Sequence, residues 1–163
     1  STFLYLKGIT NILEKFGQDR DIEIHIVGSK EKLDLKNVKE IHYEWQENTE
    51  VDTILNFDVG IMPLENTLWA KGKCAYKLIQ YMACGIPVIA SPVGMNKQVI
   101  DHGKNGFLAK TEEEWIDAFG ALYKNSEFQK KLGEQGLKKI DKIYNLEIQT
   151  QKLFKIITEV SKS

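Results

Sequence analysis

Four lysines stand together in a part of the chain that has no acidic residue. Residues 66–100 contain no Asp or Glu, and they include Lys71, Lys73, Lys77 and Lys97. Lys73 and Lys77 lie where a helix is expected to begin, and cations there oppose the partial positive charge of the unpaired backbone N–H groups. An anion bound at that point would accept hydrogen bonds from those groups and neutralise the lysines. The pattern therefore predicts an anion site, with a merely solvated lysine surface as the alternative.

The helix expected at about residues 74–83 has two different faces. One face is apolar at helical spacing and is expected to pack in the core. It consists of Ala75, Leu78, Ile79, Met82 and Ala83. The other face is polar, because Lys73, Lys77 and Gln80 follow one another at i, i+4 and i+7. Gly85 is expected to end the helix and Pro87 to open the next strand. One face would thus anchor the helix while the other presents two ammonium groups and an amide.

A second loop that could face a ligand follows the strand expected at residues 86–91. Its sequence is SPVGMNKQ, and the backbone N–H groups of Gly94, Met95 and Asn96 stand where another helix should begin. In parallel sheets, ligands bind at the carboxyl ends of the strands. The loop is therefore a candidate part of the same site, and an ordinary strand-to-helix turn is the alternative.

Strand and helix patterns alternate along the chain, which is typical of a parallel sheet with helices on both faces. Strands are expected at residues 21–29, 37–45, 58–64, 86–91 and 106–109. Helices are expected at residues 2–16, 49–57, 74–83, 95–101, 111–125, 126–140 and 145–160. A capping box of Thr111 and Glu114 and a cap at Ser126 would start two of these helices. The predicted fold class is α/β with a Rossmann-like sheet. Because the pattern opens with a helix and the chain lacks an initial Met, we expect a larger protein and a missing leading strand.

Composition limits the classes of protein that this chain can represent. Its 163 residues, of which 42% are hydrophobic, suffice for a single domain spanning 1–163. A net charge of −1 argues against a nucleic-acid partner. Neither a transmembrane run nor a signal peptide is evident, so a cytoplasmic protein with Cys74 and Cys84 reduced is expected. His25, His42 and His102 lack metal-ligand spacing, and no metal site is predicted.

Residues 77–109 carry a longer motif, KLIQYMACGIPVIASPVGMNKQVIDHGKNGFLA. It resembles the nucleotide-sugar-binding half of GT-B glycosyltransferases of the group 1 type, glycosyltransferase family 4. The resemblance extends over nearly the whole chain. It implies that this is the C-terminal, donor-binding half of a two-domain enzyme whose acceptor half is absent. The intact enzyme would transfer a sugar from a nucleotide diphosphate to a glycan or lipid-linked acceptor, with retained configuration and without a metal or cofactor.

The resemblance also implies roles for individual residues. Two family glutamates that contact the donor sugar and the ribose fall on Gly72 and Gln80, so the first contact is lost and the second is left to an amide. The segment 69–77, WAKGKCAYK, is similar to a lysine-containing variant of the family. In it, Lys73 and Lys77 would act catalytically by stabilising the leaving diphosphate. The other implied donor contacts are Cys74, Ala75, Tyr76, Gly94, Met95, Asn96, Trp45, Ser1 and Thr2. Trp45 would border the base, although a half-buried structural tryptophan is the equal alternative.

Two other functions fit parts of the pattern. A nucleotide- or phosphate-binding module without transferase activity would account for the missing glutamates. A receiver-like interaction domain would place clustered acids at the strand ends, where this chain has lysines instead. The transferase hypothesis implies a role in polysaccharide biosynthesis in the cytoplasm. It also allows the full-length protein to contact the membrane peripherally. On this reading, the isolated chain binds donor nucleotide weakly and does not turn over.

Overall fold

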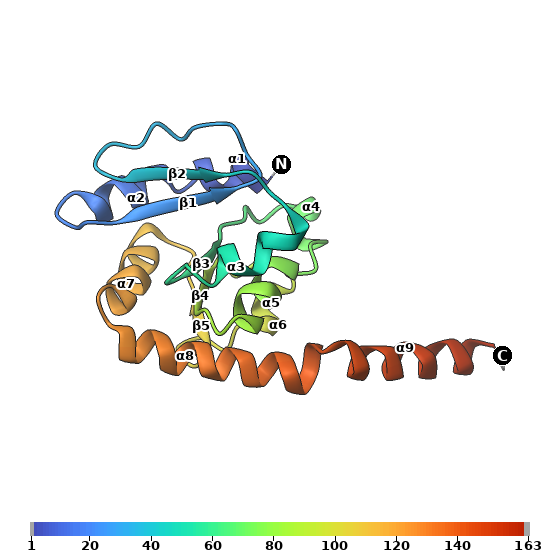
Figure 1. Ribbon diagram of the computed structural model, residues 1–163. Coiled ribbons are helices and arrows are strands. Elements are labelled where there is room, and N and C mark those ends of the chain that lie inside the picture. Colours follow the sequence, from blue (N-terminus) through green and yellow to red (C-terminus); the bar gives the residue numbers. More distant parts are fainter. Residues whose placement is uncertain (1, 162–163) are drawn as a thin grey trace.

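The computed structural model describes residues 2–161, which form an α/β domain with parallel strands (Figure 1). The strands are β1 (Glu23–Val27), β2 (Lys39–Tyr43), β3 (Gly60–Met62), β4 (Val88–Ala90) and β5 (Gly106–Leu108). The first helices are α1 (Thr2–Lys7), α2 (Thr10–Gly17), η1 (Glu47–Thr49), α3 (Glu50–Ile54) and α4 (Leu68–Lys71). The later helices are α5 (Tyr76–Ala83), α6 (Asn96–Val99), α7 (Glu112–Leu122), α8 (Ser126–Lys139), η2 (Ile140–Tyr144) and α9 (Leu146–Val160). The predicted alternation of strands and helices is confirmed.

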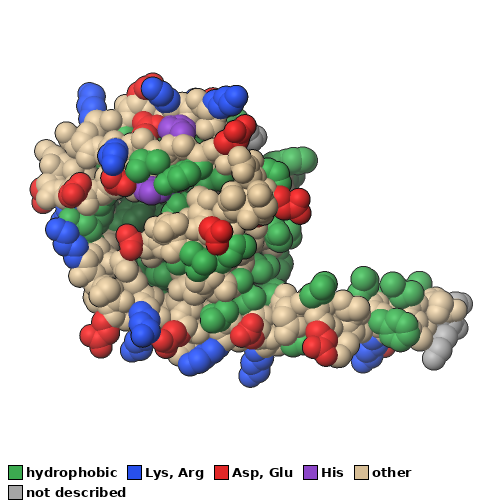
Figure 2. Space-filling view, viewed as in Figure 1, with side chains coloured by type: hydrophobic (Ala, Val, Ile, Leu, Met, Phe, Trp, Pro, Cys, Tyr) green, Lys and Arg blue, Asp and Glu red, His purple; other side chains and the backbone are tan. Residues whose placement is uncertain are grey.

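The strands form two parallel sheets rather than the single sheet that the sequence suggests. β1 pairs with β2, and β3, β4 and β5 pair in that order. Within residues 2–161 no strand lies between β1 and β3, and a cavity of about 710 Å³ separates them. Figure 2 shows the molecule hollowed there, with hydrophobic side chains inside the hollow. The predicted leading strand lies outside the described residues.

β4 is the centre of the fold because its residues are buried on both faces. Ile89 belongs to the cluster that contains Trp115 and Leu122 of α7. Val88 and Ala90 belong to a second cluster, with Leu78 and Met82 of α5. Side chains of neighbouring residues in a strand point to opposite faces, so α5 and α7 cover opposite sides of the same sheet. The prediction of helices on both faces is thereby confirmed, and α5 is fixed by its apolar side.

Two expectations about helices need correction. The single helix predicted at residues 2–16 is divided into α1 and α2 at Gly8, a residue with low helix propensity whose N–H bonds to Tyr5 O in a turn. The capping box of Thr111 and Glu114 is confirmed. The cap of α8, however, is Asn125, whose side chain accepts a hydrogen bond from the Phe128 N–H. Ser126 is instead the first residue of that helix.

The C-terminal helix α9 extends away from the body of the domain (Figure 1). None of its residues is buried, and hydrophobic side chains are exposed along it (Figure 2). They are those of Leu146, Leu153, Phe154, Ile156, Ile157 and Val160. Among the described residues, no helix combines the length and the apolar character needed to cross a membrane.

Replacing Gly133 by Ala should destabilise the domain. A Cβ at this position of α8 would lie 1.8 Å from the carbonyl oxygen of Gly85, in the turn between α5 and β4. The backbones must then separate, which we expect to cost about 1–3 kcal/mol of unfolding free energy. Gly120→Ala is the matched control. A Cβ at this position would meet nothing within 4 Å, and the substitution replaces a glycine in the interior of a helix by a better helix former. Urea unfolding should show Gly120→Ala equal to or more stable than wild type; equal stability of Gly133→Ala would contradict the packing described.

Candidate functional site

The start of α5 lies two residues later than the sequence predicts. Ala75 precedes the helix in the left-handed conformation, with φ of 57°, and no side chain caps the helix. Lys73 therefore lies before the helix, in the segment that joins α4 to α5, and not on a helical stripe with Lys77 and Gln80. Its ammonium group is 5.5 Å from the centre of the Tyr5 ring in α1. It nevertheless stays close enough to Lys77 to affect the charge on that residue.

The two predicted ligand-facing loops are in direct contact. Gly94 has φ of 52°, and a Cβ there would lie 2.7 Å from the carbonyl oxygen of Lys71. Next to this contact lies an open depression of about 500 Å³. Its lining contains two cations and no acid, and consists of Asn66, Lys71, Pro92, Gly94, Met95, Lys97 and Gln98. The structure thus gathers Lys71, Lys97, Gly94 and Met95 around one basic depression.

The remaining residues of the segment that precedes α5 differ in accessibility. Cys74 and Tyr76 are exposed, whereas Ala75 is fully buried. Gly72 has φ of −77°, and a Cβ there would make only an ordinary contact, at 3.5 Å, with Trp69 O. The backbone therefore does not require glycine at this position. The site has room for a side chain here and simply lacks one.

Of the residues predicted to contact the donor, one is hydrogen-bonded within the protein instead, and another lies outside the described residues. Asn96 is 1% exposed, and its amide donates to the carbonyl oxygen of Ser91 at 3.0 Å. Its backbone N–H donates to Val93 O at 3.1 Å, so Asn96 holds the turn that carries Gly94 and Met95. Ser1 lies outside the described residues. Thr2 is the first residue of α1, the helix that Lys73 contacts.

The structure brings Trp45 and Gln80 together through Glu50, a residue that the sequence analysis does not single out. The indole Nε1 of Trp45 donates to Glu50 Oε1 at 2.9 Å. The amide Nε2 of Gln80 donates to Glu50 Oε2, also at 2.9 Å. Glu50 opens α3, which is 30 residues from Gln80 in sequence. Because Glu50 and Gln80 belong to separate helices that are far apart in the sequence, no motif spacing could have predicted their contact.

One side of α5 carries ionisable side chains whose pKa values are shifted by burial and by neighbouring charges. Desolvation lowers the pKa of Lys77, and Lys73 adds to this effect while Glu50 opposes it. Burial, with a smaller contribution from Glu50, raises the pKa values of the Tyr81 hydroxyl and the Cys84 thiol. Lys77, Tyr81 and Cys84 are separated by four and then three residues, so Glu50 faces a single side of the helix. By its surface area, however, Lys77 is an exposed residue. An ammonium group whose charge is disfavoured gains from an anionic ligand.

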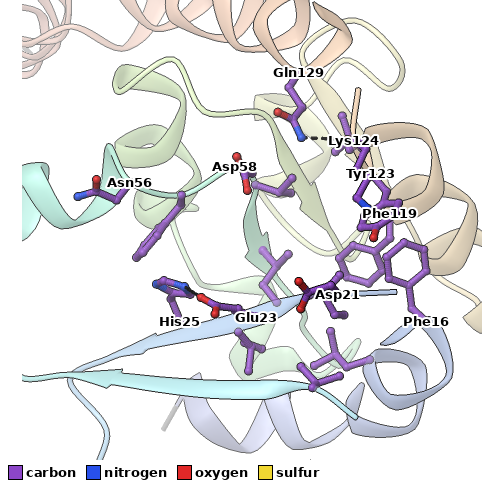
Figure 3. A pocket seen from close by; sticks show the side chains of 18 of the residues that line it. Phe16, Asp21, Glu23, His25, Asn56, Asp58, Phe119, Tyr123, Lys124 and Gln129 are labelled. Atoms are coloured by element: carbon purple, nitrogen blue, oxygen red, sulfur yellow. Dashed lines mark hydrogen bonds and ion pairs between the residues drawn. The ribbon is translucent and has the colours of Figure 1, made fainter. Parts of the chain in front are cut away.

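The larger cavity, between β1 and β3, does not suit an anion. Figure 3 shows Asp21, Glu23 and Asp58 around this cavity, and its lining also includes Lys124. Glu23 already accepts hydrogen bonds from Lys39 and His25, which lower the pKa of its carboxyl and keep it negative. The rest of the lining is largely apolar. The basic depression and the polar side of α5 are therefore the better candidate site.

The fold defines a Rossmann-like α/β domain, and the site defines a surface suited to a polyanion. The chain belongs to the group 1 glycosyl transferases, because a family model described as "Glycosyl transferases group 1" matches residues 3–125. It is 36% identical over 70 residues to a probable sucrose-phosphate synthase from Thermosipho melanesiensis, a match that covers 43% of this chain and 16% of that protein.

Solved structures show the same fold. A glycosyltransferase from Rickettsia africae superposes with a TM-score of 0.78 at 18% identity, covering 100% of this chain and 46% of that one. HepE from Anabaena, solved in complex with UDP, superposes with a TM-score of 0.67 at 16% identity, covering 91% and 44%. Both are thus more than twice as long as the part that matches. The fold is the Rossmann-like domain of GT-B glycosyltransferases, as the sequence predicts.

Removing the Lys77 charge should leave the stability of the domain intact. The lowered pKa means that the folded state disfavours the protonated amine. This cost is present at neutral pH and disappears as pH rises through the lowered pKa toward the ordinary value of 10.5. Lys77→Met should therefore melt no lower than wild type at pH 7, and any gain should narrow toward pH 10.

The matched control for this measurement is Lys139→Met. Lys139 Nζ lies 2.9 Å from Asp101 Oδ2 and 2.8 Å from Gln98 O, with only 13% of its side chain exposed. Its loss leaves two acceptors without this donor and should cost about 1–2 kcal/mol. Thermal unfolding of both variants gives the comparison. If Lys77→Met lowered the melting temperature as much as Lys139→Met does, Lys77 would serve the fold rather than a ligand.

Proposed function

We propose that this chain is the donor-binding part of a glycosyltransferase and binds a nucleotide diphosphate sugar. The observation that carries the proposal is the acid-free depression lined by Lys71 and Lys97, taken together with the mutually interacting ammonium groups of Lys73 and Lys77. A diphosphate supplies the charge that this surface lacks. The start of α5 adds backbone N–H groups, which no side chain caps. The UDP in the structure of Anabaena HepE supports a nucleotide of this kind as the ligand.

In the proposed reaction, a sugar passes to a hydroxyl of a glycan or lipid-linked acceptor with retained configuration. The bond between the anomeric carbon and the diphosphate oxygen breaks, and the acceptor oxygen forms the new bond to that carbon. The acceptor proton passes to the released nucleoside diphosphate. Negative charge grows on the diphosphate as the first bond breaks, so Lys73 and Lys77 would stabilise the transition state more than the ground state. Cations at these positions would serve in place of a metal or another cofactor.

A binding module without transferase activity is the second candidate. Gly72 favours it, because the position has space for a side chain but offers none to the donor sugar. The two candidates share the nucleotide site and differ in turnover. Transfer by the full-length protein from a radiolabelled nucleotide sugar would support the enzyme, whereas binding without transfer would support the module. For the enzyme, we propose a cytoplasmic site of action in polysaccharide assembly.

A thermal-shift panel with UDP, GDP, ADP and CMP is the first test of the site. A ligand at about 100 times its Kd adds about 2.7 kcal/mol to the free energy of unfolding, which should raise Tm by a few degrees. A shift with one diphosphate identifies the base. The same shift in EDTA would support binding without a metal. If no diphosphate shifts Tm even in the full-length protein, the proposed function is wrong.

Lys73→Ala should weaken the binding of a nucleoside diphosphate more than that of the matching nucleoside. One charge-assisted contact at a half-buried site is worth about 1.4 kcal/mol, so we expect about a tenfold rise in Kd for the diphosphate. Calorimetric titration of both ligands gives the comparison. Lys155→Ala is the control, because Lys155 lies on α9, away from the site, in an exposed pair with Glu159. An equal loss for diphosphate and nucleoside would rule out the phosphate role of Lys73.

A further inference from the structure

The cavity of about 710 Å³ between β1 and β3 separates two strand edges that have no partner strand on that side. Within the described residues, β1 pairs only with β2, and β3 only with β4. The ring of His25 in β1 lies 5.3 Å, between centroids, from that of Phe57, which shortly precedes β3, so both edges border the same space. Open strand edges present backbone N–H and C=O groups, which proteins normally pair or cover. An occupant that offers backbone hydrogen bonds to both edges would therefore stabilise this region.

The hydrogen bonds between β1 and β2 show which backbone groups of β1 point into the cavity. The Ile22 carbonyl, just before β1, accepts from the Lys39 N–H at 3.4 Å, and the Gly28 N–H, just after β1, donates to Tyr43 O at 3.0 Å. Successive residues of a strand direct their backbone groups to opposite edges, so the even-numbered residues of β1 bond to β2. The groups that face the cavity are those of Glu23, His25 and Val27.

The same alternation applies to β3. The Gly60 N–H donates to Pro87 O at 2.9 Å, and the Met62 carbonyl accepts from the Ser91 N–H at 3.2 Å, so both residues bond toward β4. The residues between and before them, Ile61 and Val59, direct their backbone groups to the cavity. Both belong to its lining, as Glu23 and His25 of β1 do. Two rows of backbone donors and acceptors thus border one space.

The cavity is apolar on both of its faces. Leu13 of α2 and Leu122 of α7 line it from one face, and Tyr81 of α5 lines it from the other. Its carboxylates lie at or before the amino ends of β1 and β3, and they are Asp21, Glu23 and Asp58 (Figure 3). A strand buried between helices on both faces is apolar throughout. An apolar small molecule would leave the two backbone edges unpaired, so an extended, apolar peptide segment matches the cavity better.

The course of α1 and α2 indicates which segment this is. At the end of α1, Lys7 Nζ lies 3.3 Å from Oε2 of Glu31, beyond the carboxyl end of β1. At the end of α2, a Cβ on Gly17 would touch Ile22 and Val38, at the amino ends of β1 and β2. The two helices therefore run back along β1 (Figure 1). Such a helical return joins a strand to a parallel neighbour, so a strand that leads into α1 would lie beside β1.

We propose that the segment directly before α1 in a longer form of this protein fills the cavity as a parallel strand and joins the two sheets into one. The chain spans 46% of the solved glycosyltransferase from Rickettsia africae, which leaves length for such a segment. Tyr81 lines the cavity four residues after Lys77, so the added strand would also support the helix that carries Lys77. The inference does not depend on the proposed function, because no nucleotide takes part in it.

Hydrogen–deuterium exchange with single-amide resolution tests the pairing in the full-length protein and in chain 1–163. The amides of His25 and Ile61 should exchange at least about tenfold more slowly in the full-length protein, because each gains a hydrogen-bond partner. The amides of Ile24 and Ile26 are the matched controls, since they bond to β2 and should be protected in both forms. Fast exchange of His25 and Ile61 in the full-length protein, with Ile24 and Ile26 protected, would overturn the inference.

A second comparison identifies the occupant. Chain 1–163 is extended by its own preceding residues, about 15 of them, enough for a strand and its connection, and by the same residues in scrambled order. Only the natural extension should slow exchange at His25 and Ile61. Equal protection by the scrambled extension, or protection in the full-length protein but not in the extended chain, would overturn the proposed occupant. So would protection of chain 1–163 alone that rises with concentration, because a second copy would then pair with these edges.

Folding of the shortened chain is checked in the same experiment. If the Ile24 and Ile26 amides exchange fast in chain 1–163, that chain is not folded, and the natural and scrambled orders are compared within the full-length protein instead. Scrambling should then release the amides of His25 and Ile61 there. Unchanged protection of both amides after scrambling would overturn the inference.

Discussion

The crowding of like charges around the start of α5 is the constraint on which the site depends. Lys73 and Lys77 lie near each other at the helix end where the backbone is already positive, and desolvation lowers the pKa of Lys77 further. Glu50 offsets part of this cost but lies on the side of Gln80. The folded chain therefore holds positive charge in a place that does not favour it. A polyanionic ligand is the component that would turn this arrangement from a cost into a gain.

The arrangement persists because packing elsewhere fixes α5. Leu78 and Met82 are fully buried against β4, and β4 is in turn held on its other face by α7. A helix fixed on its apolar side cannot rotate without opening the core, so the position of Lys77 relative to Lys73 and Glu50 is fixed as well. Close backbone contacts add to this rigidity, because Gly94 touches the backbone of Lys71 and Gly133 touches that of Gly85. The basic side chains are thus carried by a rigid framework, as precise binding requires.

The chain belongs to the group 1 glycosyl transferases, but it departs from the resembled motif at Gly72 and Gln80. The surroundings of each residue show what the departure changes. Gly72 lies in an ordinary backbone conformation with open space around it, so its lack of a side chain is a change in chemistry rather than a need of the fold. At Gln80 an amide stands where the resemblance implies a carboxylate, and this amide donates a hydrogen bond to Glu50 of α3.

The sequence by itself determined the alternation of strands and helices, the two-faced character of α5 and the acid-free window around Lys71–Lys97. These follow from hydrophobic periodicity and composition, which are local. The tertiary structure decided the start of α5, because the left-handed Ala75 excludes Lys73 from the helix. It also decided that β1 and β3 stand apart and that Glu50 meets Gln80. Contacts between residues far apart in the chain depend on how whole elements pack, and no local sequence pattern predicts them.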